Sequence, residues 1–156
     1  MTKRTNLANP GMKLRKLKMN QNFQPMSVDV EDEMYPNGFF VFNITKLLKF
    51  IKENPDKFHP EECLVSDART FPSSNLNENT IRLADISEPI ILAEIAPNRF
   101  NVIDGRHRLE NAYRMGKDKI LVYRVHPETH CKFLISKAEY EDYIEYWNSK
   151  LTELYS

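Results

Sequence analysis

The chain has 156 residues, with 22 basic and 22 acidic side chains, so its formal net charge is zero. This length fits one domain, and a hydrophobic fraction of 41% is ordinary for a globular protein. The apolar runs reach only about four or five residues, against the roughly 20 needed to cross a bilayer, which excludes a membrane-spanning segment. A dedicated nucleic-acid binder usually carries a basic excess, which this chain lacks.

The N-terminal region and the cysteines indicate a cytoplasmic protein. Lys and Arg interrupt the stretch MKLRKLKM, so the chain lacks the apolar centre of a secretory signal. Cys63 and Cys131 lie far apart and outside any CxxC pattern, which favours two buried or idle thiols over a disulfide.

Residues 1–36 are predicted to form an irregular basic leader, and 37–156 a single domain. The leader is polar and interrupted by proline and glycine, although 13–19 could add an edge strand. Its basic residues could contact nucleic-acid phosphates. The alternative is a solvated tail, or an edge strand paired with the acidic run at 29–33. The basic residues are Lys3, Arg4, Lys13, Arg15, Lys16 and Lys18.

The next elements are a strand, a helix and a long loop. FFVFNI, residues 39–44, is apolar and aromatic, which is typical of a buried strand, and Thr45 can cap the following helix. Asn54-Pro55 ends that helix. Residues 56–79 are rich in loop formers, and a connection of this length is often a functional lid. The helix buries an apolar stripe of Leu47, Leu48 and Ile51.

A strand-rich region follows. Residues 81–86 alternate as a half-buried strand does, PIILAEIA after them predicts a buried strand, and 100–103 returns as the second arm of a hairpin. Asp104-Gly105 then opens a helix from about Arg106 to Met115. The predicted buried face of this helix consists of Leu109, Ala112, Tyr113 and Met115, and Gly116 ends it.

The C-terminal part is predicted to contain one strand and one long helix. KILVYRVH, residues 119–126, has a strand pattern, with Leu121, Tyr123 and Val125 on one face. Ser136 and Glu139 form a capping box that begins a helix to about Leu154. The three- and four-residue steps between its aromatic residues favour a packing face over a base-stacking surface. These residues are Tyr140, Tyr143, Tyr146 and Trp147.

The stretch NVIDGRHRLENAYRMG carries the strongest functional signal. Positive side chains at a helix N-terminus oppose the macrodipole, so Arg106, His107 and Arg108 suggest a bound anion. Gly105 would let the free backbone amides approach that anion closely. Arginine grips a phosphate through two parallel hydrogen bonds, and His107 could donate another bond or act as an acid or base.

The alternative for this turn is purely structural. Asp104 could cap the helix while the cations face water. Arg106 and Arg108 diverge by about 200° around the helix axis, so one of them could instead pair with Glu110 or Asp104.

These residues also resemble a known family. The segments PIILAEI, FNVIDGRHRLENAYRMG and KILVYRV are similar, in residue types and in order, to the ParB/sulfiredoxin superfamily, including the ParB-like N-terminal domain. The resemblance covers residues 81–125, less than a third of the chain. Asp104, Gly105, His107 and Arg108 match the shared turn, and Arg106 stands at its variable position. Sulfiredoxins carry their reactive cysteine there, so their reaction is not expected.

The resemblance implies a compact α+β fold in which a small mixed sheet is packed by helices, with the long helix at its C-terminal end. It also implies a cradle for a nucleotide phosphate, formed by Asp104, Gly105, Arg106, His107 and Arg108. The expected ligand is ATP, ADP or CTP, with or without Mg²⁺, or another phosphorylated small molecule. The expected function is that of a phosphotransferase or nucleotide hydrolase. The alternatives are a non-catalytic adaptor that binds protein or nucleic acid, and a ParB-like nuclease.

The catalytic candidates are His107 and Glu94. An acid beside the turn could activate a hydroxyl or hold a metal next to phosphates, and Asp85 and Glu88 are the alternatives to Glu94. For each acid, a solvated edge charge is the competing interpretation.

Two further groups give weaker signals. Asp67 and Arg69 could close over a ligand, or form a plain surface salt bridge. His126, His130 and Cys131 are close in sequence, but HPETHC lacks a second ligand pair at zinc-site spacing, so we expect surface residues and assign no metal.

Overall fold

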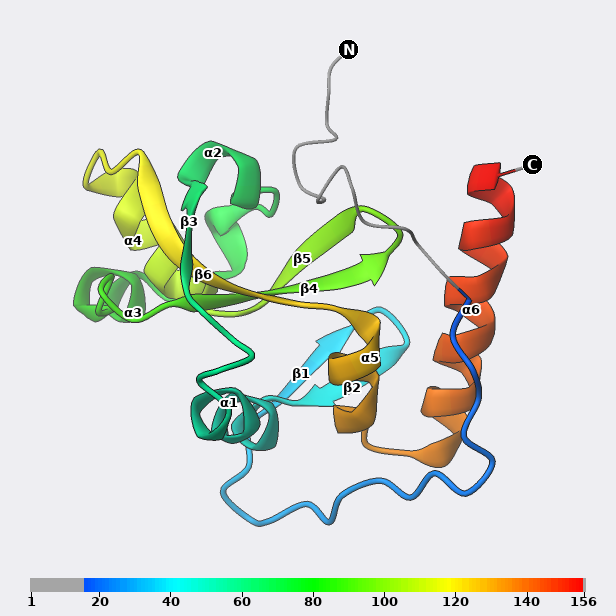
Figure 1. The fold of residues 1–156 in the computed structure, drawn as a ribbon. Coiled ribbons are helices and arrows are strands. Elements are labelled where there is room, and N and C mark those ends of the chain that lie inside the picture. Colours follow the sequence, from blue (N-terminus) through cyan, green and yellow to red (C-terminus); the bar gives the residue numbers. More distant parts are fainter. Residues whose placement is uncertain (1–15, 156) are drawn as a thin grey trace.

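The computed structural model describes residues 16–155 and is an α+β fold arranged in three layers (Figure 1). A four-stranded mixed sheet forms the middle layer. The central pair of strands is parallel, and both outer pairs are antiparallel. The strands follow the order β3 (Glu61–Leu64), β6 (Lys119–Val125), β4 (Ile90–Ala96) and β5 (Arg99–Asp104) across the sheet.

Helices cover both faces of this sheet. One face carries the α4 layer, namely α2 (Val65–Ala68), α3 (Glu78–Leu83) and α4 (Arg106–Arg114), with the short 3₁₀ turn η2 (Ser73–Asn75) between α2 and α3. The other face carries the two-stranded hairpin of β1 (Met34–Asn37) and β2 (Phe40–Asn43), followed by α1 (Ile44–Glu53). The same face carries α5 (Pro127–His130), η3 (Cys131–Phe133) and the 19-residue helix α6 (Lys137–Tyr155).

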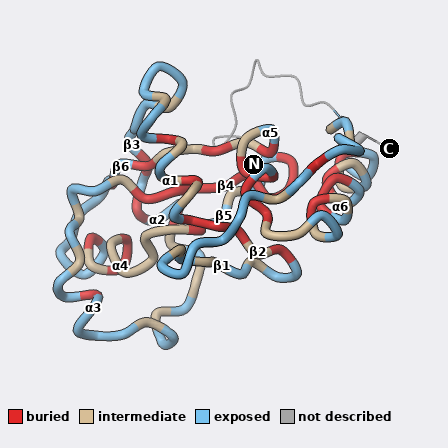
Figure 2. The backbone as a smooth tube through the Cα atoms, turned by 90° about the horizontal axis from the view of Figure 1, so that it is seen from below, coloured by how far each residue is buried: buried red, intermediate tan, exposed pale blue. Residues whose placement is uncertain are grey.

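Strand β4 is buried along its whole length, because its side chains enter a separate apolar cluster on each face of the sheet. Ile91, Ala93 and Ile95 join the cluster under α1 and α6, whereas Ile90 and Leu92 join the one under α2 and α4. Because both faces of β4 are covered, successive side chains are mostly apolar instead of alternating with polar ones, which explains the sequence PIILAEIA. Figure 2 shows these buried segments at the centre of the molecule.

The leader follows α6 over part of its length. Leu17 N donates to the side chain of Asn148 over 2.8 Å, and the same side chain donates back to Leu17 O over 3.1 Å. The Phe23 ring stacks on Tyr140 at 4.0 Å, and Asn20 N donates to the Tyr140 hydroxyl. Residues 1–15 lie outside the described residues, and so does the basic arm predicted at Lys3, Arg4, Lys13 and Arg15.

Several sequence predictions are confirmed. The α+β class, the small mixed sheet, the packed helices and the long C-terminal helix are all present. β2, β4, β5, α4 and β6 lie within two residues of their predicted bounds. Ser136 Oγ accepts from Glu139 N, which is one half of the predicted capping box, whereas Glu139 Oε1 accepts from Val41 N. Three of the four α6 aromatic residues are buried: Tyr140, Tyr143 and Trp147.

Other predictions are wrong. The strand predicted at 81–86 is helix α3 up to Leu83, because the Asn77 side chain accepts from Thr80 N and caps a helix. The predicted loop 56–79 contains β3, whose sequence EECL has one buried residue and so carries little apolar signal. In the leader, 16–19 form no strand, whereas β1 begins before residue 36.

Three side chains also differ from their predicted roles. Asn43, not Thr45, caps α1, and Thr45 Oγ1 accepts from Glu33 N instead. Tyr113 and Met115 are exposed, at 51% and 56%. The α4 position between its buried apolar residues is taken by an acid, Glu110, which is 1% exposed.

Glu110 joins α2 and α3 to α4 through arginines. Arg69 donates to both of its carboxylate oxygens, over 2.7 and 3.2 Å, and Arg114 Nε donates to one over 3.0 Å. These hydrogen bonds, that of Arg69 first, hold the pKa of Glu110 below its usual value despite burial. Arg114 also pairs with the exposed Glu78 of α3.

We therefore expect Glu110→Gln to lower the free energy of unfolding by about 2 kcal/mol, because it removes the buried charge that both arginines share. Urea denaturation followed by circular dichroism measures this loss. Glu78→Gln is the matched control, since it removes an exposed partner of the same Arg114, and it should cost much less. Equal losses for the two variants would contradict the structural role given to Glu110.

Candidate anion-binding site at the Gly105 turn

The site begins where β5 turns into α4. Asp104 ends the strand, Gly105 is the N-cap of the helix with φ of 104°, and Arg106 begins the helix. A Cβ at Gly105 would lie 2.4 Å from Ile90 Cγ2, so the turn packs directly on the first residue of β4. Both the backbone angle and this contact require glycine.

The N-terminus of α4 has no side-chain cap. The first intrahelical bond runs from Leu109 N to Gly105 O, so the amides of Arg106, His107 and Arg108 precede the hydrogen-bonded part of the helix. The expected cap, Asp104, points to Arg108 instead. The turn lines a pocket of about 490 Å³, whose other walls are Glu33 and residues Thr80, Leu83, Ala84 and Asp85 around α3.

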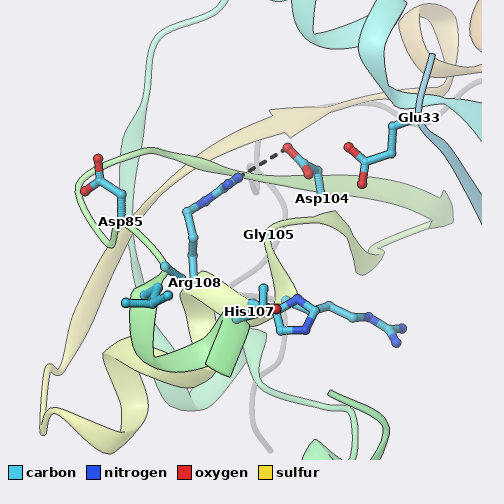
Figure 3. Close-up of a pocket in the computed structure, with 10 residues that line it drawn as sticks. Glu33, Asp85, Asp104, Gly105, His107 and Arg108 are labelled. Carbon is cyan, nitrogen blue, oxygen red and sulfur yellow. Dashed lines mark hydrogen bonds and ion pairs between the residues drawn. The ribbon is translucent and has the colours of Figure 1, made fainter. Parts of the chain in front are cut away.

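Arg108 is held by the protein but keeps donors for a ligand. Its Nη2 donates to Asp104 Oδ2 (Figure 3) and to Pro89 O, each over 3.2 Å. A guanidinium carries five N–H groups, and these two bonds use only those of Nη2, so the donors on Nη1 and Nε take no part in them. Nε is buried and has no hydrogen-bond partner among the described residues. The predicted pairing of one arginine with Asp104 is thus present.

Arg106 points away from Arg108 and packs between two aromatic rings. Its guanidinium carbon lies 5.2 Å from the centre of the Tyr35 ring and 4.9 Å from that of Phe71. Its Nε is also buried without a partner within the described chain. The two rings come from the β1–β2 hairpin and from the loop after α2, so Arg106 joins three segments at the rim of the pocket.

His107 contacts the segment that forms the opposite wall. Its Nε2 accepts a hydrogen bond from Asn77 N over 3.2 Å, so this nitrogen carries a lone pair and not a proton. Asn77 is the N-cap of α3.

Glu33 is an acid of the site that the sequence analysis did not select. It lines the pocket, and its carboxylate lies on the same side as that of Asp104 in Figure 3. Its backbone is fixed on α1, because its N donates to Thr45 Oγ1 and its O accepts from Ile44 N, each over 2.8 Å. The sequence showed Glu33 only as one member of the acidic run at 29–33.

A second hollow of about 390 Å³ continues along α1. It shares Glu33, Asp104 and Arg108 with the first pocket and extends to Lys49 and Lys52. The two hollows therefore meet at the Asp104–Arg108 pair.

Of the other acids selected from the sequence, only Asp85 lines the first pocket. Hydrogen bonds from Ser87 hold the pKa of Asp85 below the usual value. Glu88 is half exposed and pairs with Lys52 at 3.5 Å. Asp67 is exposed, and Arg69 binds Glu110, so the predicted pair of Asp67 and Arg69 does not close over the pocket.

Glu94 does not line either hollow; it belongs to a separate buried cluster. It is 2% exposed, accepts from Asn98 N and pairs with His126 Nδ1 at 2.7 Å. This hydrogen bond raises the pKa of His126 above its usual value. Glu94 O accepts from His130 Nε2 and from the Tyr143 hydroxyl.

The predicted surface position of His130 and Cys131 is wrong, because both are buried, at 0% and 6% exposed. Burial lowers the pKa of His130 to about 4 and raises that of Cys131 to about 11, so both are neutral near pH 7. Residues 16–155 contain no cluster of three or more His, Cys, Asp or Glu side chains placed to hold a metal ion.

Comparisons with protein-family models, with curated proteins and with solved structures found no match. Among the described residues, no helix is both long and apolar enough to span a membrane.

The Gly105 turn should tolerate no side chain. Gly105→Ala is expected to lower the free energy of unfolding by about 3 kcal/mol, because the new Cβ would overlap Ile90 and the φ angle is unfavourable for L-residues. Gly38→Ala is the matched control, since Gly38 also has positive φ but no atom within 4 Å of the place where a Cβ would lie, and it should cost about 1 kcal/mol. Chemical denaturation compares the two, and equal losses would contradict the packing of the turn on β4.

Proposed function

We propose that the chain is a nucleotide-binding phosphotransferase or nucleotide hydrolase of the ParB/sulfiredoxin type, and that the Gly105 turn holds the phosphate. The observation that carries this proposal is an uncapped helix N-terminus that opens into a pocket lined by two arginines, Arg106 and Arg108. Backbone amides and the helix dipole favour an anion at such a point, and an arginine adds charge-assisted hydrogen bonds.

The remaining walls of the pocket fit the rest of a nucleotide. Leu83 is 74% exposed and lines the pocket with Ala84, so the α3 side offers an apolar wall to a base. Asp85 and Thr80 on the same side can accept or donate hydrogen bonds to a ribose. A pocket of about 490 Å³ is within the usual range for small-molecule sites.

The Glu33 carboxylate would act as the general base for phosphoryl transfer. In this reaction a hydroxyl or water oxygen attacks the terminal phosphorus, and the bond from that phosphorus to the leaving phosphate oxygen breaks. The proton of the attacking group would pass to the Glu33 carboxylate, which lies on the Asp104 side of the pocket. The second hollow, which shares Glu33 and Arg108, gives the acceptor a place beside the phosphate.

A Mg²⁺ ion would fit this arrangement. Mg²⁺ is usually bound by one or two carboxylates together with substrate phosphates, and Asp104 presents a carboxylate at the turn, in the lining of the pocket. When bound with the nucleotide, it would neutralise phosphate charge. Asp104 would then orient Arg108 and contribute to the metal site.

Replacing Arg108 tests the binding part of the proposal. A thermal-shift panel with ATP, ADP, CTP and GTP, each with and without Mg²⁺, first identifies the ligand, because binding to the folded state raises stability. Arg108→Ala should then weaken that nucleotide by about tenfold or more in calorimetry, since it removes charge-assisted hydrogen bonds.

Two further variants make this test specific. Arg108→Lys keeps the charge without the planar fork and should recover only part of the affinity. Arg99→Ala removes an exposed arginine at the other end of β5 and should bind as the wild type does. Unchanged affinity in a folded Arg108→Ala variant would overturn the assignment of this site.

Replacing Glu33 tests the catalytic part. Glu33→Gln keeps the size of the side chain but cannot take a proton, so phosphate release or transfer should fall by about 100-fold or more while nucleotide affinity changes little. Glu31→Gln changes a neighbouring exposed acid and serves as the control. Full turnover in Glu33→Gln would exclude Glu33 as the base.

A further inference from the structure

We propose that His107 is a positioning residue whose side chain latches the α3 segment, residues 77–84, as a lid over the pocket. This inference rests on the proposed function only for what the lid covers, a nucleotide at the Gly105 turn. The latch itself follows from the hydrogen bond between Asn77 N and His107 Nε2 and from the way α3 is attached to α4.

The attachment is polar and lies along one stripe of α4. His107, Asn111 and Arg114 are spaced by four and three residues, which places them on one face of the helix. His107 binds Asn77 N, Asn111 donates to Ala84 O over 3.0 Å, and Arg114 pairs with Glu78. His107 thus holds the beginning of the α3 segment, Arg114 holds its first turn, and Asn111 holds its end.

The apolar contribution to this attachment is small. Ile81 is the only buried residue of α3, and Leu83 is 74% exposed. A helix of six residues is not stable by itself, because nucleation costs more than so few hydrogen bonds return. The order of α3 therefore depends on the polar stripe, which is the behaviour of a segment that can open and close.

His107 connects this lid to the ligand. Its backbone amide is one of the free amides at the start of α4, and its side chain holds the N-cap residue of α3. Thr80, Leu83 and Ala84, which follow Asn77 in the segment, line the pocket. The same residue thus contributes to the phosphate cradle and fixes the wall that faces the base.

The hydrogen bond from Asn77 N to His107 Nε2 allows two roles of the His107 side chain to be told apart: a latch for α3, or a catalytic acid or base. An Nε2 that accepts from a backbone amide cannot at the same time donate a proton to a phosphate. A glutamine carries its side-chain carbonyl oxygen at about the reach of Nε2, so it can accept the Asn77 N–H bond, but it cannot perform acid or base catalysis near neutral pH.

The test compares His107→Ala with His107→Gln by amide hydrogen exchange across residues 77–84. Loss of the latch in His107→Ala should speed exchange there by about tenfold, and His107→Gln should restore slow exchange. His59→Ala changes an exposed histidine away from the pocket and should leave this exchange unchanged. Fast exchange in both His107 variants, or in neither, would overturn the latch.

Nucleotide affinity then tests what the lid covers. With the nucleotide found by the thermal-shift panel, His107→Ala should bind several-fold more weakly, His107→Gln should bind nearly as the wild type does, and the bound nucleotide should slow exchange of 77–84. A nucleotide that binds without slowing this exchange would overturn the lid. If no nucleotide binds the wild type, the proposed function fails, while the exchange of the two variants still decides on the latch.

Discussion

The contact between the Gly105 turn and Ile90 is the constraint on which the site depends. The turn lies directly on the first residue of β4, a strand buried on both faces, so the start of α4 cannot shift without disturbing the core. This fixes the direction of α4 and therefore of its first amides. Asp104 and Arg108, on either side of the glycine, then pair with each other and leave the helix end open to the pocket.

The parts of the fold set by neighbouring residues were predictable from the sequence. β4, β5, α4 and β6 follow from apolar runs and from one Asp-Gly turn, and the candidate cradle at 104–108 is contiguous. The rest of the site comes from residues distant in sequence, because Glu33 lines the pocket and Tyr35 and Phe71 contact Arg106. The proximity of Glu33 and Tyr35 to the turn depends on how the hairpin and α1 pack. α3 was missed because a single Asn77 cap outweighs a short alternating pattern.

The distribution of charge explains how an anion site fits a chain with zero net charge. The arginines near the site each have an internal acidic or aromatic partner: Arg108 has Asp104, Arg69 and Arg114 share Glu110, and Arg106 has its two rings. These partners fix the guanidinium groups before a ligand arrives, which lowers the entropy cost of binding. Glu94, in contrast, is occupied by the His126 pair on the other part of β4.

Residues 17–23 of the leader pack along α6 and so join the two ends of the described chain. Leu17 and Asn148 exchange hydrogen bonds across a separation of 131 residues, and the Phe23 ring lies flat on Tyr140. Neither end can detach without exposing apolar surface on the other. A protease that cuts between Leu17 and Phe23 would therefore also expose the part of α6 that carries Tyr140 and Asn148.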